Sequence, residues 1–187
     1  GLVTNAVLGG GYSARLNEEI RIKRGLSYGA SSALSPMLTT GSFTAQAQTK
    51  NESAAQVVEL MKGELTKLGT ETVPADELIA RKSSLIGSYG DNLATANGLA
   101  GILGNLSFYG IDLGETQAYT TKVNAVTTDQ IKAFAKAQFD PSKVSFIIVG
   151  DKTKMGDAIG KTLPAATVIP VSGLDLDSAD LKAAPKP

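Results

Sequence analysis

The sequence predicts an α+β domain, with a mainly antiparallel sheet and helices packed on one face of it. Two strand-type segments, residues 26–35 and 43–48, lie close together near the N-terminus. Helical periodicity then dominates residues 54–89 and 127–139, so strands and helices are grouped and do not alternate strictly. A last apolar run at 144–149 predicts a further, buried strand.

The amino-acid composition limits the kinds of binding partner that we expect for this chain. Among 187 residues, 42% are hydrophobic, 19% are charged, and 18 Lys and Arg balance 18 Asp and Glu. A balanced chain of this kind gives no reason to expect nucleic acid or an anionic membrane as a partner. We find no apolar run near the ~20 residues that a membrane-spanning helix needs.

The chain contains no histidine and no cysteine. This excludes a Ser-His-Asp triad, a histidine general base and a zinc site with imidazole or thiolate ligands within the chain. Carboxylates alone could hold magnesium or calcium, but no EF-hand pattern is present. We therefore expect no metal to be bound by this chain.

Three consecutive glycines interrupt the N-terminal segment. Residues 2–8 are apolar but too short to separate helix from strand, and Gly9, Gly10 and Gly11 interrupt them. The pattern Gly9, Gly11, Ala14 matches a degenerate dinucleotide motif, but residues 30–38 lack the acidic residue that such a site needs. We interpret the triplet as a hinge that lets helix ends approach closely.

A short helix and two strands follow the triplet. Ser13 is a candidate N-cap, and Gly25 suits the C-terminal end of the helix. After the strand at 26–35, Phe43, Ala45 and Ala47 alternate with polar residues, which predicts a second strand with one buried face.

The middle of the chain is predicted to be helical. An apolar stripe runs through residues 54–68, and Pro74 suits the first turn of the next helix. The buried face of that helix is predicted to comprise Leu78, Ile79, Leu85, Ile86 and Tyr89. A third helical segment, residues 93–109, carries Gly98, Gly101 and Gly104, which indicates either close backbone packing or local flexibility.

The C-terminal part begins with a capping box. Thr127 and Gln130 form this pattern before a helix, and the chain turns at Asp140-Pro141 ahead of the strand at 144–149. We assign residues 1–163 to one domain and residues 164–187 to an irregular tail.

Arg21 and Tyr28 are the candidate site residues. They lie seven residues apart across a predicted helix-to-strand corner, and each side chain offers hydrogen-bond donors. Aimed at one point, the pair could bind a peptide carbonyl and stabilise its developing oxyanion. Two structural alternatives stay open at this point: Arg21 could pair with Glu18 on the same helix, and Tyr28 could be an ordinary surface tyrosine.

The segment LGGGYSARLNEEIRIKRGLSYGASS resembles the second, metal-free homologous domain of pitrilysin/insulysin-type zinc metallopeptidases, a family that includes the mitochondrial processing peptidase. The similarity continues through GSFTAQAQTKNESAAQVVELMKGELTKL, VPADEL, VTTDQIKAFAKAQFDPSK and VSFIIVGD. It spans roughly residues 5 to 152.

The resemblance implies a role for the candidate pair. In that family an inverted H-x-x-E-H helix of another domain holds zinc, whose bound water is activated by the glutamate. The facing metal-free domain supplies an Arg and a Tyr, seven residues apart, that bind substrate near the scissile bond. These positions match Arg21 and Tyr28; Arg24 is nearer to Tyr28 in sequence but lacks the seven-residue spacing.

Two departures from the family pattern shape the functional hypothesis. The chain has no H-x-x-E-H, so it is not expected to cleave peptides alone. It also begins inside a family domain, so an N-terminal strand is expected as a missing, separate fragment. The implied function is the non-zinc-binding component of a heterosubunit bacterial zinc metallopeptidase, partnered by a zinc-bearing subunit and acting on a peptide substrate. The alternatives are a non-catalytic scaffold subunit, or part of a single-chain peptidase with its zinc site upstream. The expected compartment is the bacterial periplasm, with the cytoplasm as the alternative.

Overall fold

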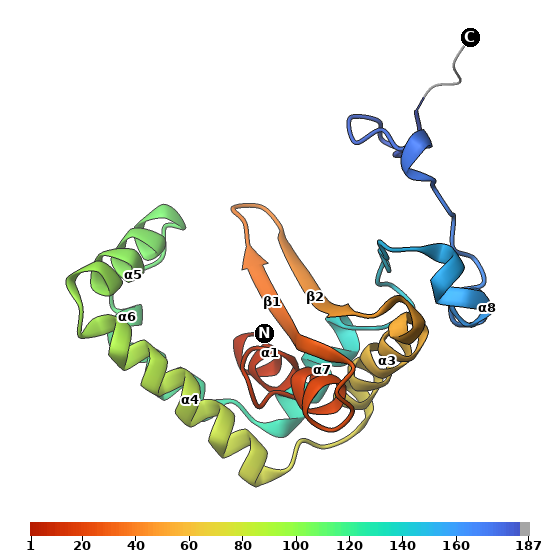
Figure 1. The fold of residues 1–187 in the computed structure, drawn as a ribbon. Helices are drawn as coiled ribbons and strands as arrows, with labels where there is room; N and C mark the ends of the chain where they lie inside the picture. Colours follow the sequence, from red (N-terminus) through yellow and green to blue (C-terminus); the bar gives the residue numbers. More distant parts are fainter. Residues whose placement is uncertain (184–187) are drawn as a thin grey trace.

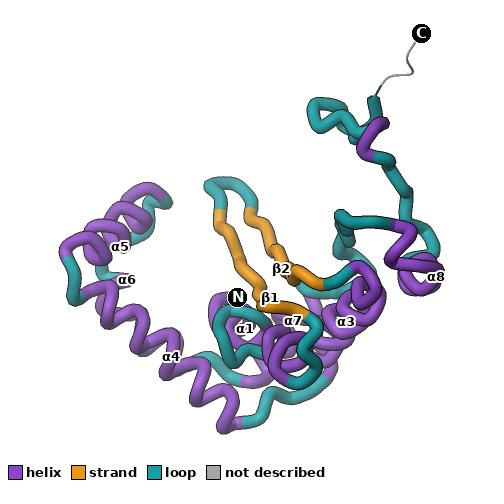
Figure 2. The backbone as a smooth tube through the Cα atoms, viewed as in Figure 1, coloured by secondary structure: helices purple, strands orange, loops and turns teal. Residues whose placement is uncertain are grey.

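The computed structural model describes residues 1–183 and has an α+β fold, as the sequence predicts (Figures 1 and 2). Its two-stranded antiparallel sheet is formed by β1 (Ser27–Pro36) and β2 (Gly41–Thr49). The α-helices of the described part are α1 (Leu2–Leu8), α2 (Arg15–Asn17), α3 (Ala54–Thr70), α4 (Ala75–Leu93), α5 (Ala96–Phe108), α6 (Glu115–Ala125), α7 (Thr128–Gln138) and α8 (Lys152–Thr162). A π-helix, η1 (Glu18–Ile22), continues α2, and two 3-10 turns are η2 (Asn51–Ser53) and η3 (Val171–Gly173).

The core lies between one face of the β1–β2 hairpin and helices α1, α3 and α7, which are grouped at the base of the hairpin in Figure 1. The alternation predicted for β2 is present, since Phe43, Ala45 and Ala47 are half-buried against this core. The Phe43 ring stacks on Phe139 with centroids 4.1 Å apart. Other fully buried core side chains are Leu8, Leu16, Ile20, Leu68 and Ile131.

Residues 2–8 are helical, which resolves the ambiguity left by their short apolar pattern. The helix ends where the amides of Gly9 and Gly10 both donate to the carbonyl of Asn5, at 2.9 and 2.8 Å. Asn5 also donates through Nδ2 to the carbonyl of Ser32, and its Oδ1 accepts from the Ser32 hydroxyl. Helix α1 is therefore fastened to β1 directly before the glycine triplet.

Helices α4, α5 and α6 form an arm that leads away from the core (Figure 2). Tyr89 of α4 stacks on Tyr119 of α6, with ring centroids 3.9 Å apart. The predicted buried face of α4 was partly wrong, because Ile79 is 64% exposed, whereas Leu78 is buried and Leu85 and Ile86 are half-buried against the core. Adjacent residues point about 100° apart on a helix, and at this end of α4 the face that buries Leu78 leaves Ile79 exposed.

The three glycines in and around α5 do not share one role. A Cβ on Gly98 would collide with the backbone of Asn92, so close packing applies there. Nothing lies within 4 Å of the Cβ positions of Gly101 and Gly104. The capping box before α7 is confirmed, with the Gln130 amide donating to Thr127 Oγ1 at 3.2 Å and the Thr127 amide donating to Gln130 Oε1 at 3.0 Å.

The predicted buried strand at 144–149 is wrong for the described chain. The segment is irregular, and Ile147 and Val149 are 86% and 93% exposed. A strand needs a neighbouring edge for its backbone groups. Within residues 1–183, none of the backbone groups of 144–149 takes part in a backbone–backbone hydrogen bond. The apolar composition is therefore present without the pairing that would make it a strand.

Two helices were missed from the sequence, α6 and α8. Helix α8 begins at an N-cap, Asp151, whose Oδ1 accepts from the amides of Thr153 and Lys154 at 2.9 and 3.4 Å. Beyond α8 the described tail holds only η3 and an isolated bridge between Leu174 and Lys182. The division at residue 163 stays a prediction, and residues 184–187 of the predicted tail lie outside the described residues. Among residues 1–183, no helix has the length and apolar character to cross a membrane.

Candidate functional site

Arg21 and Tyr28 lie side by side at the corner between η1 and β1. The guanidinium carbon of Arg21 lies 5.0 Å from the centre of the Tyr28 ring. It lies at the same distance, 5.0 Å, from the ring of Tyr12, which follows the glycine triplet. The arginine thus lies within cation–π distance of two aromatic rings, whose quadrupoles attract the cation.

A π-helical turn places Arg21. The amide of Lys23 donates to the carbonyl of Glu18, and the amide of Leu26 donates to the carbonyl of Ile20, each at 2.9 Å. These bonds span more residues than the bonds of an α-helix, so the turn is widened. Gly25, at φ +61, then reverses the chain towards β1 in a conformation that favours glycine. Wide turns of this kind are frequent at functional sites.

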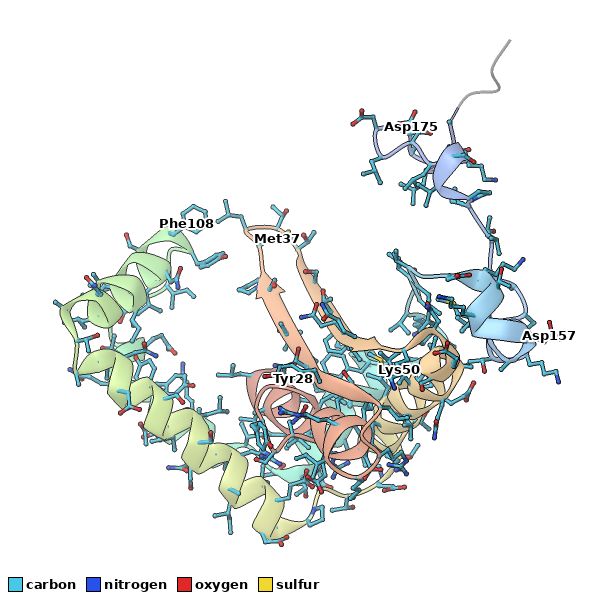
Figure 3. All side chains as sticks on the ribbon, viewed as in Figure 1. Tyr28, Met37, Lys50, Phe108, Asp157 and Asp175 are labelled. Carbon is cyan, nitrogen blue, oxygen red and sulfur yellow. The ribbon has the colours of Figure 1, made fainter. Side chains whose placement is uncertain are left out.

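A β-bulge places Tyr28. Ser27 pairs with Thr49 and Ala30 pairs with Ala47, so Tyr28 and Gly29 lie opposite a single residue of β2. The extra residue interrupts the alternation of the strand and redirects its side chains. Tyr28 is 87% exposed as a result, and Figure 3 shows it beside the base of the hairpin.

Asn17 ties the two parts of this corner together. Its side-chain amide donates to the carbonyl of Tyr12 at 2.6 Å, and its Oδ1 accepts from the amide of Ala30 at 3.2 Å. Asn17 is buried, and its bond with Ala30 is shielded from water, whereas the bond to Tyr12 is partly buried. One side chain therefore fixes the backbone of the glycine turn relative to β1, just beyond the bulge.

The glycine triplet allows this close packing. A Cβ on Gly9 would lie 2.5 Å from the backbone nitrogen of Ser32, and the Ser32 amide donates to the Gly9 carbonyl at 2.9 Å. Gly11 has open space around its Cβ position. Close approach to β1 therefore accounts for Gly9, and hinge motion of Gly9, Gly10 and Gly11 stays a prediction.

The donors of the candidate pair are uncommitted in the described part of the chain. Within residues 1–183, neither the Arg21 guanidinium nor the Tyr28 hydroxyl makes a hydrogen bond, and Arg21 forms no ion pair with Glu18. The two neighbouring cations differ, because Lys23 and Arg24 both bind Glu19 at 2.5 Å. The hydrogen bond from Lys23, with Arg24 adding to it, lowers the pKa of the Glu19 carboxyl.

Two further arginines fasten the corner to α4. Arg15 binds Glu77 through two hydrogen bonds, from Nε at 2.9 Å and from Nη2 at 2.7 Å. These contacts raise the pKa of the Arg15 guanidinium. Arg81 of α4 donates to the hydroxyl of Ser13 at 2.6 Å and also to its carbonyl. Ser13, the predicted N-cap, thus binds α4 and does not cap α2, whose N-cap is Ala14.

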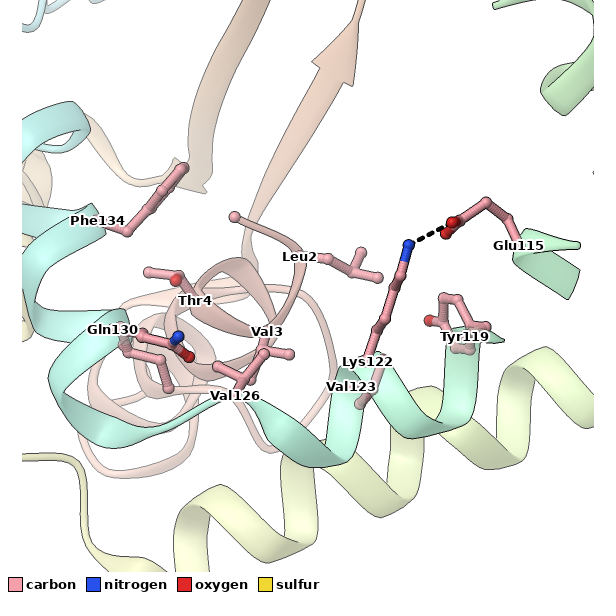
Figure 4. A pocket seen from close by; sticks show the side chains of 12 residues that line it. Leu2, Val3, Thr4, Glu115, Tyr119, Lys122, Val123, Val126, Gln130 and Phe134 are labelled. Atoms are coloured by element: carbon pink, nitrogen blue, oxygen red, sulfur yellow. Dashed lines mark hydrogen bonds and ion pairs between the residues drawn. The ribbon is translucent and has the colours of Figure 1, made fainter. Parts of the chain in front are cut away.

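The chain offers no donor set for a metal at this corner. The sequence has no histidine or cysteine, and residues 1–183 contain no group of three or more candidate ligands that could hold a metal ion. A zinc ion therefore does not fit the residues present. A pocket of about 420 Å³ lies elsewhere, between α1 and helices α6 and α7 (Figure 4). Its lining is mainly apolar, and none of the candidate residues contributes to it.

Neither Tyr12 nor Asn17 was predicted from the sequence, although both contribute to this corner. A polar residue between Leu16 and Ile20 on a short helix was the available signal, since a buried Asn must find partners. The bulge at Tyr28–Gly29 has a weaker signal, a glycine inside a strand pattern.

Comparison with known proteins shows which domains the chain is similar to. Residues 1–85 match the family model described as the peptidase M16 inactive domain. A crystal structure of a peptidase M16 inactive domain from Pseudomonas fluorescens is 29% identical, with a TM-score of 0.67 over 75% of this chain and 34% of that one. An inactive peptidase domain from Bordetella parapertussis shares the fold at 15% identity, with a TM-score of 0.62 over 74% of this chain and 75% of that one.

Curated relatives agree with this class. A Helicobacter pylori protein named a non-peptidase homolog is 28% identical over 79% of this chain and 34% of its own length. An uncharacterized zinc protease of Mycobacterium leprae is 30% identical over 71% of this chain and 30% of its own length. The chain therefore spans about a third of these relatives. The resemblance predicted from the sequence is confirmed as a similarity: residues 1–85 match the peptidase M16 inactive domain, and relatives named as zinc proteases or as a non-peptidase homolog match more of the chain.

Proposed function

We propose that the chain is the non-zinc-binding component of a zinc metallopeptidase, and that Arg21 and Tyr28 bind and polarise a peptide carbonyl opposite a partner's zinc site. The observation that carries the proposal is the arrangement of the pair. The guanidinium lies 5.0 Å from the centres of two aromatic rings, and its donors make no hydrogen bond within residues 1–183. A structural arginine would ordinarily use those donors on a carboxylate of its own chain, as Arg15 and Arg24 do.

The chemistry follows from the donor types. A guanidinium donates several N–H groups in a fixed plane and stays charged at any working pH. When water attacks a peptide carbonyl, negative charge develops on the carbonyl oxygen, and preorganised donors stabilise it. Arg21 would supply the charge and Tyr28 a directed hydroxyl donor. A zinc ion, which would have to be held by a partner subunit or another domain, would supply the activated water.

A non-catalytic scaffold is the second candidate. It is supported by the name of the Helicobacter pylori relative, which describes that protein as a non-peptidase homolog. A third arrangement places the zinc-bearing domain on the same polypeptide. Reading the encoding gene and its neighbours for an H-x-x-E-H helix separates the one-chain arrangement from the two-chain arrangement.

The test is reconstitution with the zinc-bearing partner, followed by peptide cleavage. Arg21→Ala and Tyr28→Phe should each lower kcat by about 10²–10³, the usual effect of removing an oxyanion donor. Subunit association, measured by sedimentation, should be unchanged. Arg24→Ala is the matched control, because Arg24 is committed to Glu19 and should leave cleavage near the unsubstituted level.

The outcomes discriminate among the candidates. Unchanged cleavage by both site variants would reject the assigned role of the pair. A reconstituted complex that assembles, retains zinc and cleaves no peptide would instead favour the scaffold. A loss of cleavage in Arg24→Ala as large as in Arg21→Ala would show that general charge, and not the pair, is responsible.

A further inference from the structure

The hairpin formed by β1 and β2 carries no charged side chain. Between Arg24 and Lys50 the sequence contains no Asp, Glu, Lys or Arg, although 19% of the whole chain is charged. The face of the hairpin that packs on the core would lack charge in any case, but charged residues normally lie on exposed surfaces. The absence of charge from the exposed face of the hairpin therefore calls for a different reason.

Small side chains and side-chain amides make up this exposed face. Residues directly opposite each other in an antiparallel pair point to the same side of the sheet, so Ser31 lies next to Gln46. The result is a surface that offers hydroxyl and amide groups but no ionised group. We call it the uncharged face; its exposed residues are Ser31, Ala33 and Ser35 of β1 and Ser42, Thr44, Gln46 and Gln48 of β2.

The polar side chains of the uncharged face are not used by the fold. Within residues 1–183, none of them makes a side-chain hydrogen bond. Two other hydroxyls of the same strands do make one. The Ser32 hydroxyl donates to Asn5 Oδ1 at 2.8 Å. The Thr49 hydroxyl donates to the carbonyl of Leu26 at 2.5 Å. The hydroxyl and amide groups of the uncharged face are therefore available to a ligand.

The uncharged face adjoins the candidate site. Gln48 is the residue of β2 that lies opposite the bulge, which contains Tyr28 and Gly29. Figure 3 shows Tyr28 at the base of the hairpin and Met37 at its tip. At about 3.3 Å per residue, the strand from Tyr28 towards the tip is long enough to face about six residues of an extended peptide. A peptide held at Arg21 and Tyr28 can therefore continue along this face.

We propose that the uncharged face selects the peptide substrate, by favouring segments without charged side chains next to the carbonyl that Arg21 and Tyr28 bind. This selection rests on the proposed function, because it presupposes that the pair binds the substrate. The occupant of the face is the same extended peptide, since the face begins beside Tyr28.

The physical reason is the cost of taking a charge out of water. A peptide that lies against the face displaces water from both surfaces. A Lys or Glu of the peptide would then lose hydration without meeting an opposite charge, which is unfavourable for either sign. Uncharged polar side chains lose less, because hydroxyl and amide groups of the face can donate to them or accept from them.

The test uses the complex reconstituted with the zinc-bearing partner. A quenched fluorescent peptide without charged residues is compared with two sets of derivatives, in which one Lys or one Glu is placed at each position in turn. At the positions that lie against the uncharged face, either charge should lower kcat/KM relative to the uncharged peptide. The Lys and Glu derivatives should be affected alike, because the face carries neither sign of charge.

Substitution of Gln46 tests whether this face is responsible. Gln46→Glu should raise the ratio of kcat/KM for the Lys derivative to kcat/KM for the Glu derivative about two- to five-fold, the strength of an exposed ion pair, and Gln46→Lys should lower it by a similar factor. Ser31→Glu, at the paired position, should act in the same direction as Gln46→Glu. Gln56→Glu is the matched control, because Gln56 is exposed on α3, which packs on the core side of the hairpin.

The outcomes separate this inference from the function on which it rests. Cleavage that depends on Arg21 but not on peptide charge would overturn the selection and leave the role of the pair intact. A preference that neither the Gln46 variants nor Ser31→Glu shift, or that Gln56→Glu shifts equally, would also overturn it. A complex that cleaves none of the peptides would reject the proposed function and this inference together.

Discussion

The corner that carries Arg21 and the segment of residues 144–149 both expose large side chains, but they differ in the hydrogen bonds that hold their backbones. Around Arg21, Asn17 bonds two backbone segments and Arg15 and Arg81 bind the neighbouring elements. Around Ile147, no backbone hydrogen bond is present within the described chain. The exposed side chains of the corner are therefore carried by a backbone that hydrogen bonds hold in place, whereas those of residues 144–149 are not.

The largest expected effect on the free energy of unfolding comes from a core residue, which is compared with an exposed residue of the 144–149 segment. Phe139 is fully buried against Phe43 and Phe134, so Phe139→Ala should lower the free energy of unfolding by about 3–5 kcal/mol. Ile147→Thr, at an 86% exposed position, should change it by less than about 0.5 kcal/mol. Denaturant unfolding of the 187-residue chain measures both. Equal costs would mean that residue 147 is packed as tightly as the core.

An intermediate effect tests how closely the glycine turn packs against β1. Gly9→Ala would place a methyl group 2.5 Å from the Ser32 nitrogen, and overpacking of this kind costs about 1–3 kcal/mol. Gly11→Ala is the matched control, since nothing lies within 4 Å of its Cβ position. Thermal unfolding should separate the two variants. A neutral Gly9→Ala would show that α1 and β1 can move apart, which is the behaviour expected of a hinge.

The smallest effect concerns Tyr12. Its ring lies 5.0 Å from the guanidinium carbon of Arg21, and an exposed cation–π contact is worth about 0.5–1 kcal/mol. Tyr12→Leu should therefore raise the KM of the reconstituted peptidase about two- to five-fold, whereas Tyr12→Phe should retain the ring and the KM. The NMR shift of the Arg21 side chain gives a readout independent of activity, because ring currents move it. An unchanged shift in Tyr12→Leu would contradict the stacking.

Local patterns predicted much of the fold, for identifiable reasons. The capping box at Thr127, the alternation of β2 and the apolar stripe of α3 are all encoded within a few residues of each other. The errors arise where contacts between residues far apart in the sequence determine the structure. Ile79 is apolar but lies on the exposed face of α4. Residues 144–149 have the composition of a strand but no neighbouring strand to pair with in the described chain. Helix α6 has a weakly amphipathic sequence, so its pattern gave little to detect.

The two candidate site residues could be predicted from the sequence, but the contacts that hold them in place could not. The motif resemblance pointed to Arg21 and Tyr28, and the structure brings them together. It gave no role to Asn17 or Tyr12, because their contacts depend on how the glycine turn folds back against β1. Such contacts join residues whose relation is set by tertiary packing, which a linear pattern does not contain.

The bulge at Tyr28 and Gly29 makes the corner sensitive to chain length as well as to side-chain identity. Removing Gly29 would leave one residue opposite one residue between the Ser27 and Ala30 pairings. The strand would regain its regular alternation, and a shift of one residue turns a side chain to the opposite face of a sheet. A deletion that leaves both Arg21 and Tyr28 in the sequence would thus part them in space. The direction of the Tyr28 side chain therefore depends on the number of residues between Tyr28 and the next regular pair of the sheet, as well as on the identity of the side chain.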